Sequence, residues 1–376
     1  MQSLLQKIYQ KIPLSLILFF TLLPFGNFFF RGMDLWHGVG MYVQIGVLAI
    51  FSLSLFKYNK PLGLLTFWLG LLTSIIWYEV FQKTNNYAIK IFLPFFNFLT
   101  IVILYKLIVE YINTEYLEKI FRYLSYSLLI ILFYCVLQYF NLDQFFKHYS
   151  VAGAKDQMVG TIGNQSHLAG FLALIIPFFF NNIYALILIG LLITLCNSAS
   201  GIIIGISIIL FYLFHTHRQR FYGVLSGSIM CMIMGFIFFR NFFSFEGRLE
   251  LWKRVYQVFT EKPITGQGLG TFSLMQIKLL PNETIWRHVH NELYQLALEA
   301  GLIGLFLAIW CIYDYFRTFT VFKTSLTIKL ASIFFGFCIL CLFSFPCHLW
   351  LISIIGLLSY AGVYIIKKES LKCEPV

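Results

Sequence analysis

Charge is scarce in this chain. Only 11% of its 376 residues are Asp, Glu, Lys or Arg, and the mean hydropathy is +0.80. Soluble globular domains carry about 25% charged residues, so this composition excludes that class. An aromatic content of 19% excludes an intrinsically disordered chain as well. The class that remains is a polytopic membrane protein.

The chain also lacks a cluster of basic residues, although 27 Lys and Arg outnumber 16 Asp and Glu. The basic residues are scattered between apolar runs, whereas a nucleic-acid interface needs them gathered on one surface. Cys338 and Cys341 form a CxxC pair, but no second pair or histidine follows at zinc spacing. We therefore exclude a nucleic-acid partner and attribute the positive charge to membrane topology.

Long apolar runs are abundant, and a membrane-spanning helix needs about 20 mostly apolar residues. Such runs lie at 12–30, 35–56, 61–80, 88–109, 123–142, 167–182, 183–199, 201–216, 221–239, 293–316, 327–345 and 347–366. The region 167–216 is the hardest to divide. We predict an all-α polytopic membrane protein with about twelve transmembrane helices, which forms a single integral membrane domain over residues 1–376.

The distribution of Lys and Arg predicts the orientation. With the N-terminus in the cytoplasm, fifteen basic residues fall on the inside and five in the short outside loops. This bias follows the positive-inside rule and places both termini in the cytoplasm. The long segment 240–292 then lies outside, and long ordered loops are more often functional than short ones. We expect it to be an extracytoplasmic catalytic loop that contains short amphipathic helices.

The first part of this loop has helical periodicity. Its apolar residues recur at helical spacing from Leu251 to Phe259, so we expect an amphipathic helix on the membrane surface. Arg248 and Trp252 stand four residues apart and share a face of that helix. One interpretation makes them headgroup contacts with Trp252 as an interfacial anchor; the other places Arg248 in an anion site.

A glycine-rich turn follows at Pro263, Gly266, Gly268 and Gly270. Glycines permit positive φ and a close approach of the backbone to a ligand. The segment is either a simple turn or a nest of amides for phosphate.

The segment Arg287-His288-Val289-His290-Asn291 directly precedes the tenth predicted span. Asn291 is a candidate N-cap, which places His290 at a helix N-terminus, where the partial positive charge disfavours protonation. A neutral imidazole there can accept a proton. Two further interpretations are a metal site, for which only two ligands are evident, and a pair of solvated interfacial histidines.

Together these motifs resemble those of the O-antigen ligase family, membrane glycosyltransferases related to O-antigen polymerases. This chain matches the family signature at His290, Asn291, Gly301 and Gly304. In that signature, His and Asn are followed by nine residues, a Gly, two further residues and a small residue. The family's upstream pattern of Arg, Trp and Pro-x-x-Gly-x-Gly is also present. Its matches are Arg248, Trp252, Pro263, Gly266 and Gly268. A third block, from Gly160 to Phe171, resembles Gly-Thr-x-Gly-Asn-Pro-Asn but departs from it at Gln165 and Ser166.

A family arginine is absent. The family often has Ser-Arg before small residues after an apolar helix, whereas this chain has Ser198-Ala199-Ser200-Gly201. That arginine is thought to help hold the lipid diphosphate, so another residue must replace it or the activity has diverged. Arg240, Arg254 and Arg287 are the candidates.

The resemblance implies transfer of a glycan from undecaprenyl diphosphate to a sugar hydroxyl, with inversion at the anomeric carbon. His290 is then the candidate base, and Arg248 is a second catalytic residue that binds the donor diphosphate. Further diphosphate contacts are expected from Arg254, Arg287, Gly266 and Gly268, and supporting roles from His288, Asn291, Trp252, Asn164 and Gly301. Asn164 and His167 are expected either to line a substrate entrance or to close the turn before a span.

The implied acceptor is lipid A-core for a ligase, which is the activity we predict, or another glycan for a polysaccharide polymerase. No cofactor and no metal are expected; the partners are the lipid-linked donor, the acceptor and membrane lipids. The location is the bacterial inner membrane, with segment 240–292 in the periplasm. A transporter or lipid flippase is the alternative of another class, but such proteins often have repeated halves with ionisable residues at the midplane. Here no repeat is evident, and polar residues concentrate in the outer loop.

Overall fold

The computed structural model describes residues 104–142, 158–162, 164–225, 246–267, 272 and 288–373, and this part of the chain is helical. The long helices are α5 (Thr114–Tyr139), α8 (Ala199–Thr216), α12 (Glu292–Val321), α13 (Ser325–Phe343) and α14 (Trp350–Cys373). The shorter ones are α6 (Gln165–Leu174), α7 (Ile183–Leu195) and α10 (Glu246–Phe259), with 3₁₀ turns at η2 (Ile176–Phe179) and η4 (Pro346–His348). The predicted spans 12–30, 35–56 and 61–80, most of 88–109 and most of 221–239 lie outside these residues.

Five helices are long and apolar enough to cross a membrane within the described residues: α5, α8, α12, α13 and α14. They correspond to the predicted spans at 123–142, 201–216, 293–316, 327–345 and 347–366. An all-helical fold is thus confirmed for this part of the chain, and it contains five candidate membrane-spanning helices. A count of twelve helices stays a prediction.

The region 167–199 differs from the two full spans that we predict there. Helix α6 has ten residues and gives way to the 3₁₀ turn η2, in which Pro177 stands near the start. Helix α7 has thirteen residues and begins after Asn182, whose side chain accepts a hydrogen bond from the Ala185 amide. Proline has no amide hydrogen, so Pro177 favours the end of regular helix, and Asn182 favours a new helix start as an N-cap. Both interrupt an apolar run that appears continuous from hydropathy alone.

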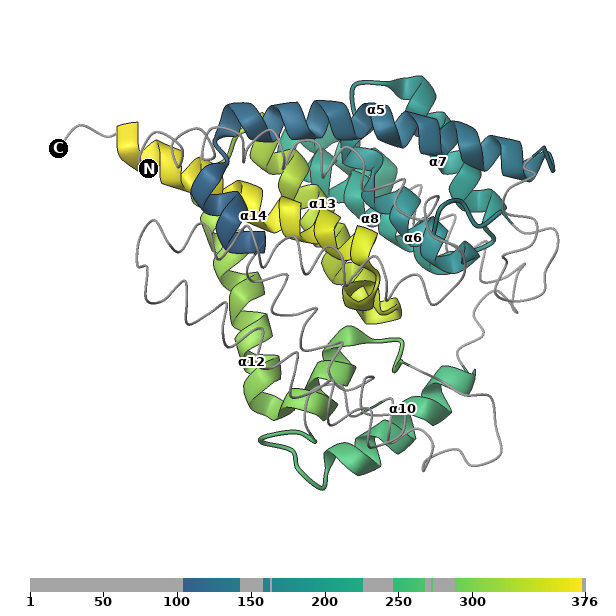
Figure 1. The fold of residues 1–376 in the computed structure, drawn as a ribbon, viewed down its shortest axis with the longest axis vertical. Helices are drawn as coiled ribbons and strands as arrows, with labels where there is room; N and C mark the ends of the chain where they lie inside the picture. Colours follow the sequence, from purple (N-terminus) through teal and green to yellow (C-terminus); the bar gives the residue numbers. More distant parts are fainter. Residues whose placement is uncertain are drawn as a thin grey trace, which may run out of the picture.

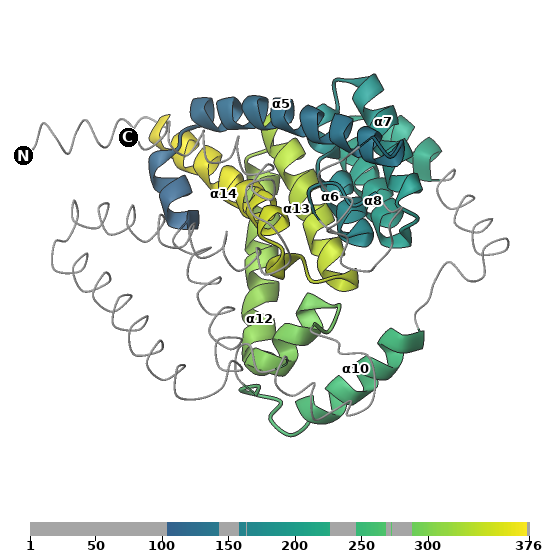
Figure 2. The same ribbon diagram turned by 45° about the vertical axis from the view of Figure 1, so that its right-hand side comes forward.

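The bundle is held together by one large apolar core. Helix α13 packs between α8 and α14, α6 packs on α8, and α5 crosses α14 (Figures 1 and 2). The largest buried side chains include Tyr315, Phe171 and Phe319. Gly201 lets α8 approach α6, because a Cβ at this position would lie 2.5 Å from the Cβ of Ala169. Small residues permit such close helix contacts, which membrane bundles use for packing.

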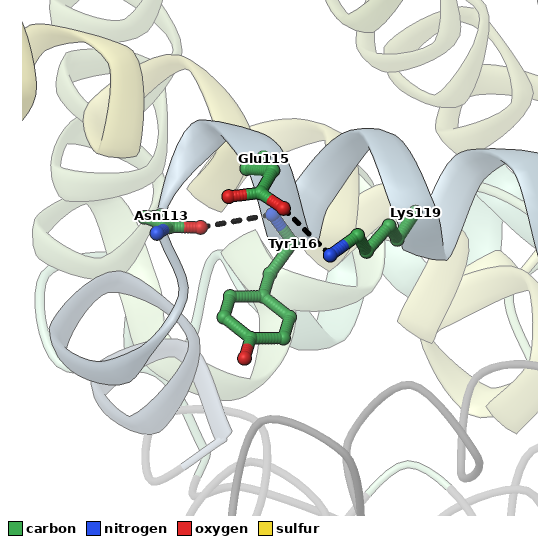
Figure 3. Close-up of polar contacts among 4 residues, drawn as sticks. All are labelled: Asn113, Glu115, Tyr116 and Lys119. Carbon is green, nitrogen blue, oxygen red and sulfur yellow. Dashed lines mark hydrogen bonds and ion pairs between the residues drawn. The ribbon is translucent and has the colours of Figure 1, made fainter. Parts of the chain in front are cut away.

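The two ends of the bundle differ in chemistry. At one end α14 finishes beside the start of α5: Lys368 donates to the carbonyl of Val109 at 2.5 Å, and Glu369 accepts from the Thr114 amide. Figure 3 shows how α5 begins there, with Asn113 accepting from the Tyr116 amide and Glu115 paired with Lys119 at 2.6 Å. Several basic residues gather at this end, which we call the basic end: Lys106, Lys119, Arg218, Lys323, Lys367 and Lys368.

At the opposite end α6, α8, α12 and α14 begin, and α5 and α13 finish. We call this the histidine end, after His167, His288 and His290. Helix α10 lies beyond the bundle, next to the N-terminal part of α12 (Figures 1 and 2). The described helices thus place the basic residues of the basic end away from the three histidines.

Candidate active site

The predicted amphipathic helix is α10, but protein covers its apolar face. Leu251 and Val255 are buried, with 3% and no exposure, against residues from the end of the outer loop and from α12. The members of this small core are Leu251, Val255, Phe272, Val289 and Leu298. The expected position flat on the membrane surface is therefore wrong for this face, because periodicity shows that a stripe is apolar but not what covers it.

Trp252 ties α10 to the histidine segment. Its indole N–H donates to the carbonyl of Val289 at 2.9 Å, and the Tyr294 hydroxyl donates back to the carbonyl of Trp252 at 3.0 Å. The rings of Trp252 and Tyr294 meet edge to face. Trp252 thus holds the segment between His288 and His290, while its expected supporting role in catalysis stays a prediction.

Asn291 caps α12 as predicted. Its side chain accepts from the Tyr294 amide at 2.9 Å, while His290 just before it adopts a left-handed backbone with φ of 57°. Such a conformation is uncommon outside glycine and is often found where a side chain is held for function. It turns the chain sharply at His290.

Three histidines surround one aromatic ring. Phe345, in the turn between α13 and α14, stacks on His288 at 4.2 Å between centroids and meets His167 and His290 edge to face at 4.7 and 5.0 Å. His167 Nδ1 also lies 3.4 Å from the Ser344 hydroxyl. The third sequence block and the His-Asn motif therefore meet at this turn. Phe345 was not among the predicted site residues, because it ends the predicted span 327–345 and belongs to no motif.

Arg248 reaches the same turn from α10. Its guanidinium donates to the carbonyl of Phe343 at 3.2 Å and is half-buried. Burial lowers the pKa of this guanidinium, which stays charged at neutral pH all the same. Burial lowers the pKa of the His290 imidazole to about 4, and the charges of Arg248 and His167 add to the shift. His290 is therefore neutral at pH 7, as predicted, although burial and Arg248 are the causes.

The glycine turn and the kink of α12 form a single joint. Gly301 interrupts α12 with φ of 68°, which frees the amides that follow it. The Leu302 amide donates to the carbonyl of Pro263 at 2.8 Å, and the Gln267 amide donates to the carbonyl of Leu298 at 2.9 Å. A Cβ on Gly301 would lie 2.1 Å from the Ile264 carbonyl oxygen, and one on Gly266 would lie 2.4 Å from that of Glu299. Only glycine fits at either position.

This joint changes the expected role of Gly266. Its amide donates to the carbonyl of Lys262 at 2.9 Å, so it is occupied within the turn and does not serve as a phosphate donor here. Gly268 and Arg287 lie outside the described residues. Arg254 pairs with Glu250 at 3.1 Å and follows Arg248 by six residues, which places it about 120° around the helix. The structure does not bring Arg254 to His290.

Asn164 closes the turn before α6, where its side chain accepts from the amides of Ser166 and His167 at 2.9 and 3.2 Å. Ser198 begins α8 and contacts Ser200 through the two hydroxyls at 3.0 Å. Gly201, in the first turn of α8, contacts Ala169 of α6. The position of the absent family arginine, Ala199, therefore lies close to α6 at the histidine end.

Within the described ranges, no group of three His, Cys, Asp or Glu side chains is arranged to hold a metal ion.

Comparison with known proteins identifies the family of this region. A Rickettsia felis protein named "Putative polysaccharide ligase" is 35% identical over 88 residues, and that match covers 21% of this chain and 21% of the relative. Residues 184–309 match the O-antigen ligase family. This range contains α10, the glycine turn, the His-Asn motif and Gly301. About a third of the chain, including the joint between α10 and α12, is thus similar to the O-antigen ligase family.

Proposed function

We propose that this protein transfers a glycan from undecaprenyl diphosphate to a sugar hydroxyl of lipid A-core at the outer face of the bacterial inner membrane. The family consists of membrane enzymes, which supports a glycosyltransferase over a transporter. The name of the Rickettsia felis relative, a polysaccharide ligase, favours ligation over polymerisation. The loop 240–292 is then periplasmic and both termini are cytoplasmic.

The observation that carries this proposal is the meeting of Arg248 and His290 at the turn after α13. A charged guanidinium suits a diphosphate, and a neutral imidazole suits a hydroxyl that must lose its proton. The two groups are close enough for the charge of Arg248 to lower the pKa of His290. The site therefore combines an anion-binding group with a proton acceptor.

The reaction is a single displacement. The acceptor oxygen bonds to the anomeric carbon as the bond from that carbon to the diphosphate oxygen breaks. The hydroxyl proton passes to a nitrogen of His290, and undecaprenyl diphosphate leaves as an anion that needs no proton. Arg248 stabilises the charge that develops on the diphosphate, and such groups are worth about 10²–10³ in turnover. A single displacement inverts the anomeric carbon.

A diphosphate paired with Arg248 also raises the pKa of His290. The pKa of about 4 belongs to the site with an uncompensated guanidinium. Anionic phosphates nearby favour the protonated imidazole and raise this pKa towards the operating pH, where a general base is most effective. We assign Arg254 and Arg287 to outer contacts of the donor, and the chemistry needs no metal because arginines neutralise the diphosphate.

The base role is tested with purified protein and an undecaprenyl diphosphate-linked oligosaccharide, by measuring release of undecaprenyl diphosphate in the presence of lipid A-core. His290→Ala is expected to lower turnover by about 10²–10⁴-fold, the range of positioned general-base catalysis. His217→Ala is the control, since His217 is exposed and follows α8 at the basic end. Full activity of the His290 variant would remove the base from the mechanism.

The acceptor is decided in the same reconstituted system. Lipid A-core and a second donor molecule are offered in separate reactions, and the lengthened product is identified by mass. Extension of lipid A-core alone is the expected result. Extension of the second donor alone would make the enzyme a polymerase with the same chemistry.

A further inference from the structure

The backbone of Val289 is held on both sides. Its carbonyl accepts the indole N–H of Trp252 at 2.9 Å, and its amide donates to Oε1 of Gln295 at 3.2 Å. Val289 itself is fully buried and stands between His288 and His290. The held amide belongs to the peptide after His288 and the held carbonyl to the peptide before His290, so a shift of this backbone would move both histidines.

Gln295 is held in turn by Glu299. The Gln295 side-chain amide donates to Oε1 of Glu299 at 3.3 Å, one turn further along α12. The same carboxylate oxygen accepts the amide of Phe272 at 3.3 Å. Glu299 therefore joins the end of the outer loop to the histidine segment through Gln295.

Both side chains are buried, and each is 5% exposed. A carboxylate or an amide buried in this way is costly unless it is hydrogen-bonded, which makes the geometry of this pair strict. They stand four residues apart on the first part of α12, so they share one face. That part of the helix ends at the Gly301 joint, which anchors it to the loop.

We propose that Gln295 and Glu299 are positioning residues for His290. Glu299 orients the amide of Gln295, and Gln295 fixes the backbone amide of Val289. With the Val289 carbonyl held by Trp252, this backbone sets the direction of the His290 imidazole towards Arg248 and Phe345. The proposal rests on the base role of His290. Glu299 takes no part in proton transfer.

Conservative and non-conservative changes separate positioning from chemistry. Glu299→Gln keeps an oxygen that can accept from both Phe272 and Gln295, so its activity is expected to stay within about threefold of wild type. Gln295→Ala releases the backbone amide of Val289 and is expected to lower kcat by up to about 100-fold, the scale of a 1 Å misplacement. KM for the donor should change little, because Arg248 keeps its contact with Phe343.

An exchange of the two residues gives the sharpest test. Gln295→Glu places two carboxylates together, where both cannot ionise without repulsion. Combining it with Glu299→Gln restores each bond: Glu at 295 accepts from Val289 and from the new amide at 299, and Gln at 299 accepts from Phe272. We expect the single variant to lose activity and the double variant to recover at least half of it. Failure of the double variant to recover, with the protein folded by size-exclusion chromatography, would overturn the proposal.

The same variants are then made with His290→Ala. If Gln295 acts through His290, Gln295→Ala lowers activity no further in that background. A full additional loss would show that Gln295 acts elsewhere and would sink the positioning role. An active His290→Ala protein would instead overturn the base role, so the two failures are distinguishable. If an alanine variant does not fold, the exchange experiment alone decides.

Discussion

Arg248 and His290 lie on different elements, yet each determines how useful the other is. Burial and the charge of the guanidinium lower the pKa of the imidazole, and the guanidinium itself donates to the carbonyl of Phe343. In an empty site the two groups repel when His290 is protonated. A diphosphate relieves that repulsion, so donor binding and proton uptake by His290 favour each other.

Replacing Arg248 tests this coupling. Arg248→Gln is expected to lower turnover about 100-fold or more, since the charge on the diphosphate loses its partner. In the pH profile of the residual activity, the decrease on the acid side should occur at a higher pH than in the wild type. The reason is that the charge of Arg248 lowers the pKa of His290, activity needs the neutral imidazole, and removing the charge raises that pKa. The measurement is a pH profile of kcat/KM.

Lys253→Gln is the matched control, because Lys253 is an exposed cation on the same helix. It should change neither turnover nor the pH profile. If the acid side of the pH profile does not move in the Arg248 variant, the coupling is contradicted.

Arg254→Gln tests the outer contact that we assign to Arg254. Such a contact binds the donor without taking part in the reaction, so we expect a higher KM for the donor and an unchanged kcat.

Residue-level reasoning from the sequence reached part of this site. Asn291 as a cap follows from local chemistry, and a neutral His290 follows from its place at a helix start. Burial and Arg248 as the causes of the lowered pKa do not follow, because they depend on contacts between α10, α12 and the turn after α13. Phe345 was missed for the same reason: nothing in the order of residues brings it to three histidines.

At the level of elements, α10 and α12 act as one unit. The break at Gly301 frees backbone groups that the glycine turn accepts, and Trp252 and Tyr294 tie the two helices together. Two sequence motifs that look independent are thus halves of one joint. The spacing of residues could predict the glycine turn and the break at Gly301 separately. It could not predict that the two contact each other, because their hydrogen bonds join backbone atoms, which carry no sequence signal.

Gly301→Ala tests the joint. A left-handed conformation costs a non-glycine residue about 1–3 kcal/mol, and the added Cβ would also collide with the Ile264 carbonyl. We expect a lower unfolding temperature in detergent and loss of activity. Gly190→Ala in α7 is the control, since no atom lies within 4 Å of a Cβ built there. Equal stability of the two variants would refute the joint.

For the molecule as a whole, the bundle has one basic end and one histidine end, and this arrangement agrees with the topology that Lys and Arg predict. Hydropathy located the five long helices well, because length and apolarity define a span. It failed over 167–199, where Pro177 and Asn182 divide an apolar run into pieces too short to cross alone. Local breaks are averaged away in a hydropathy window.

The side of the membrane is tested by cysteine labelling in intact cells, with Cys347 replaced by Ser. Lys253→Cys on α10 should react with an impermeant maleimide added outside the inner membrane, because α10 is expected in the periplasm. Lys323→Cys, exposed at the basic end, should react only after that membrane is permeabilised. The reverse pattern would invert the topology and with it the location of the reaction.

The break at Gly301 also determines how much of α12 is available to cross the membrane. From Leu302 to Val321 helix α12 has twenty residues, which at about 1.5 Å each span about 30 Å, the thickness of the hydrocarbon layer. The nine residues before the break are then left above the acyl chains, at the level of the headgroups. A diphosphate attached to a polyisoprenyl tail is confined to that same level. If the proposed function holds, the lipid-linked donor and the His290 imidazole would meet in this headgroup layer, so the donor would reach the site by diffusion in two dimensions instead of three.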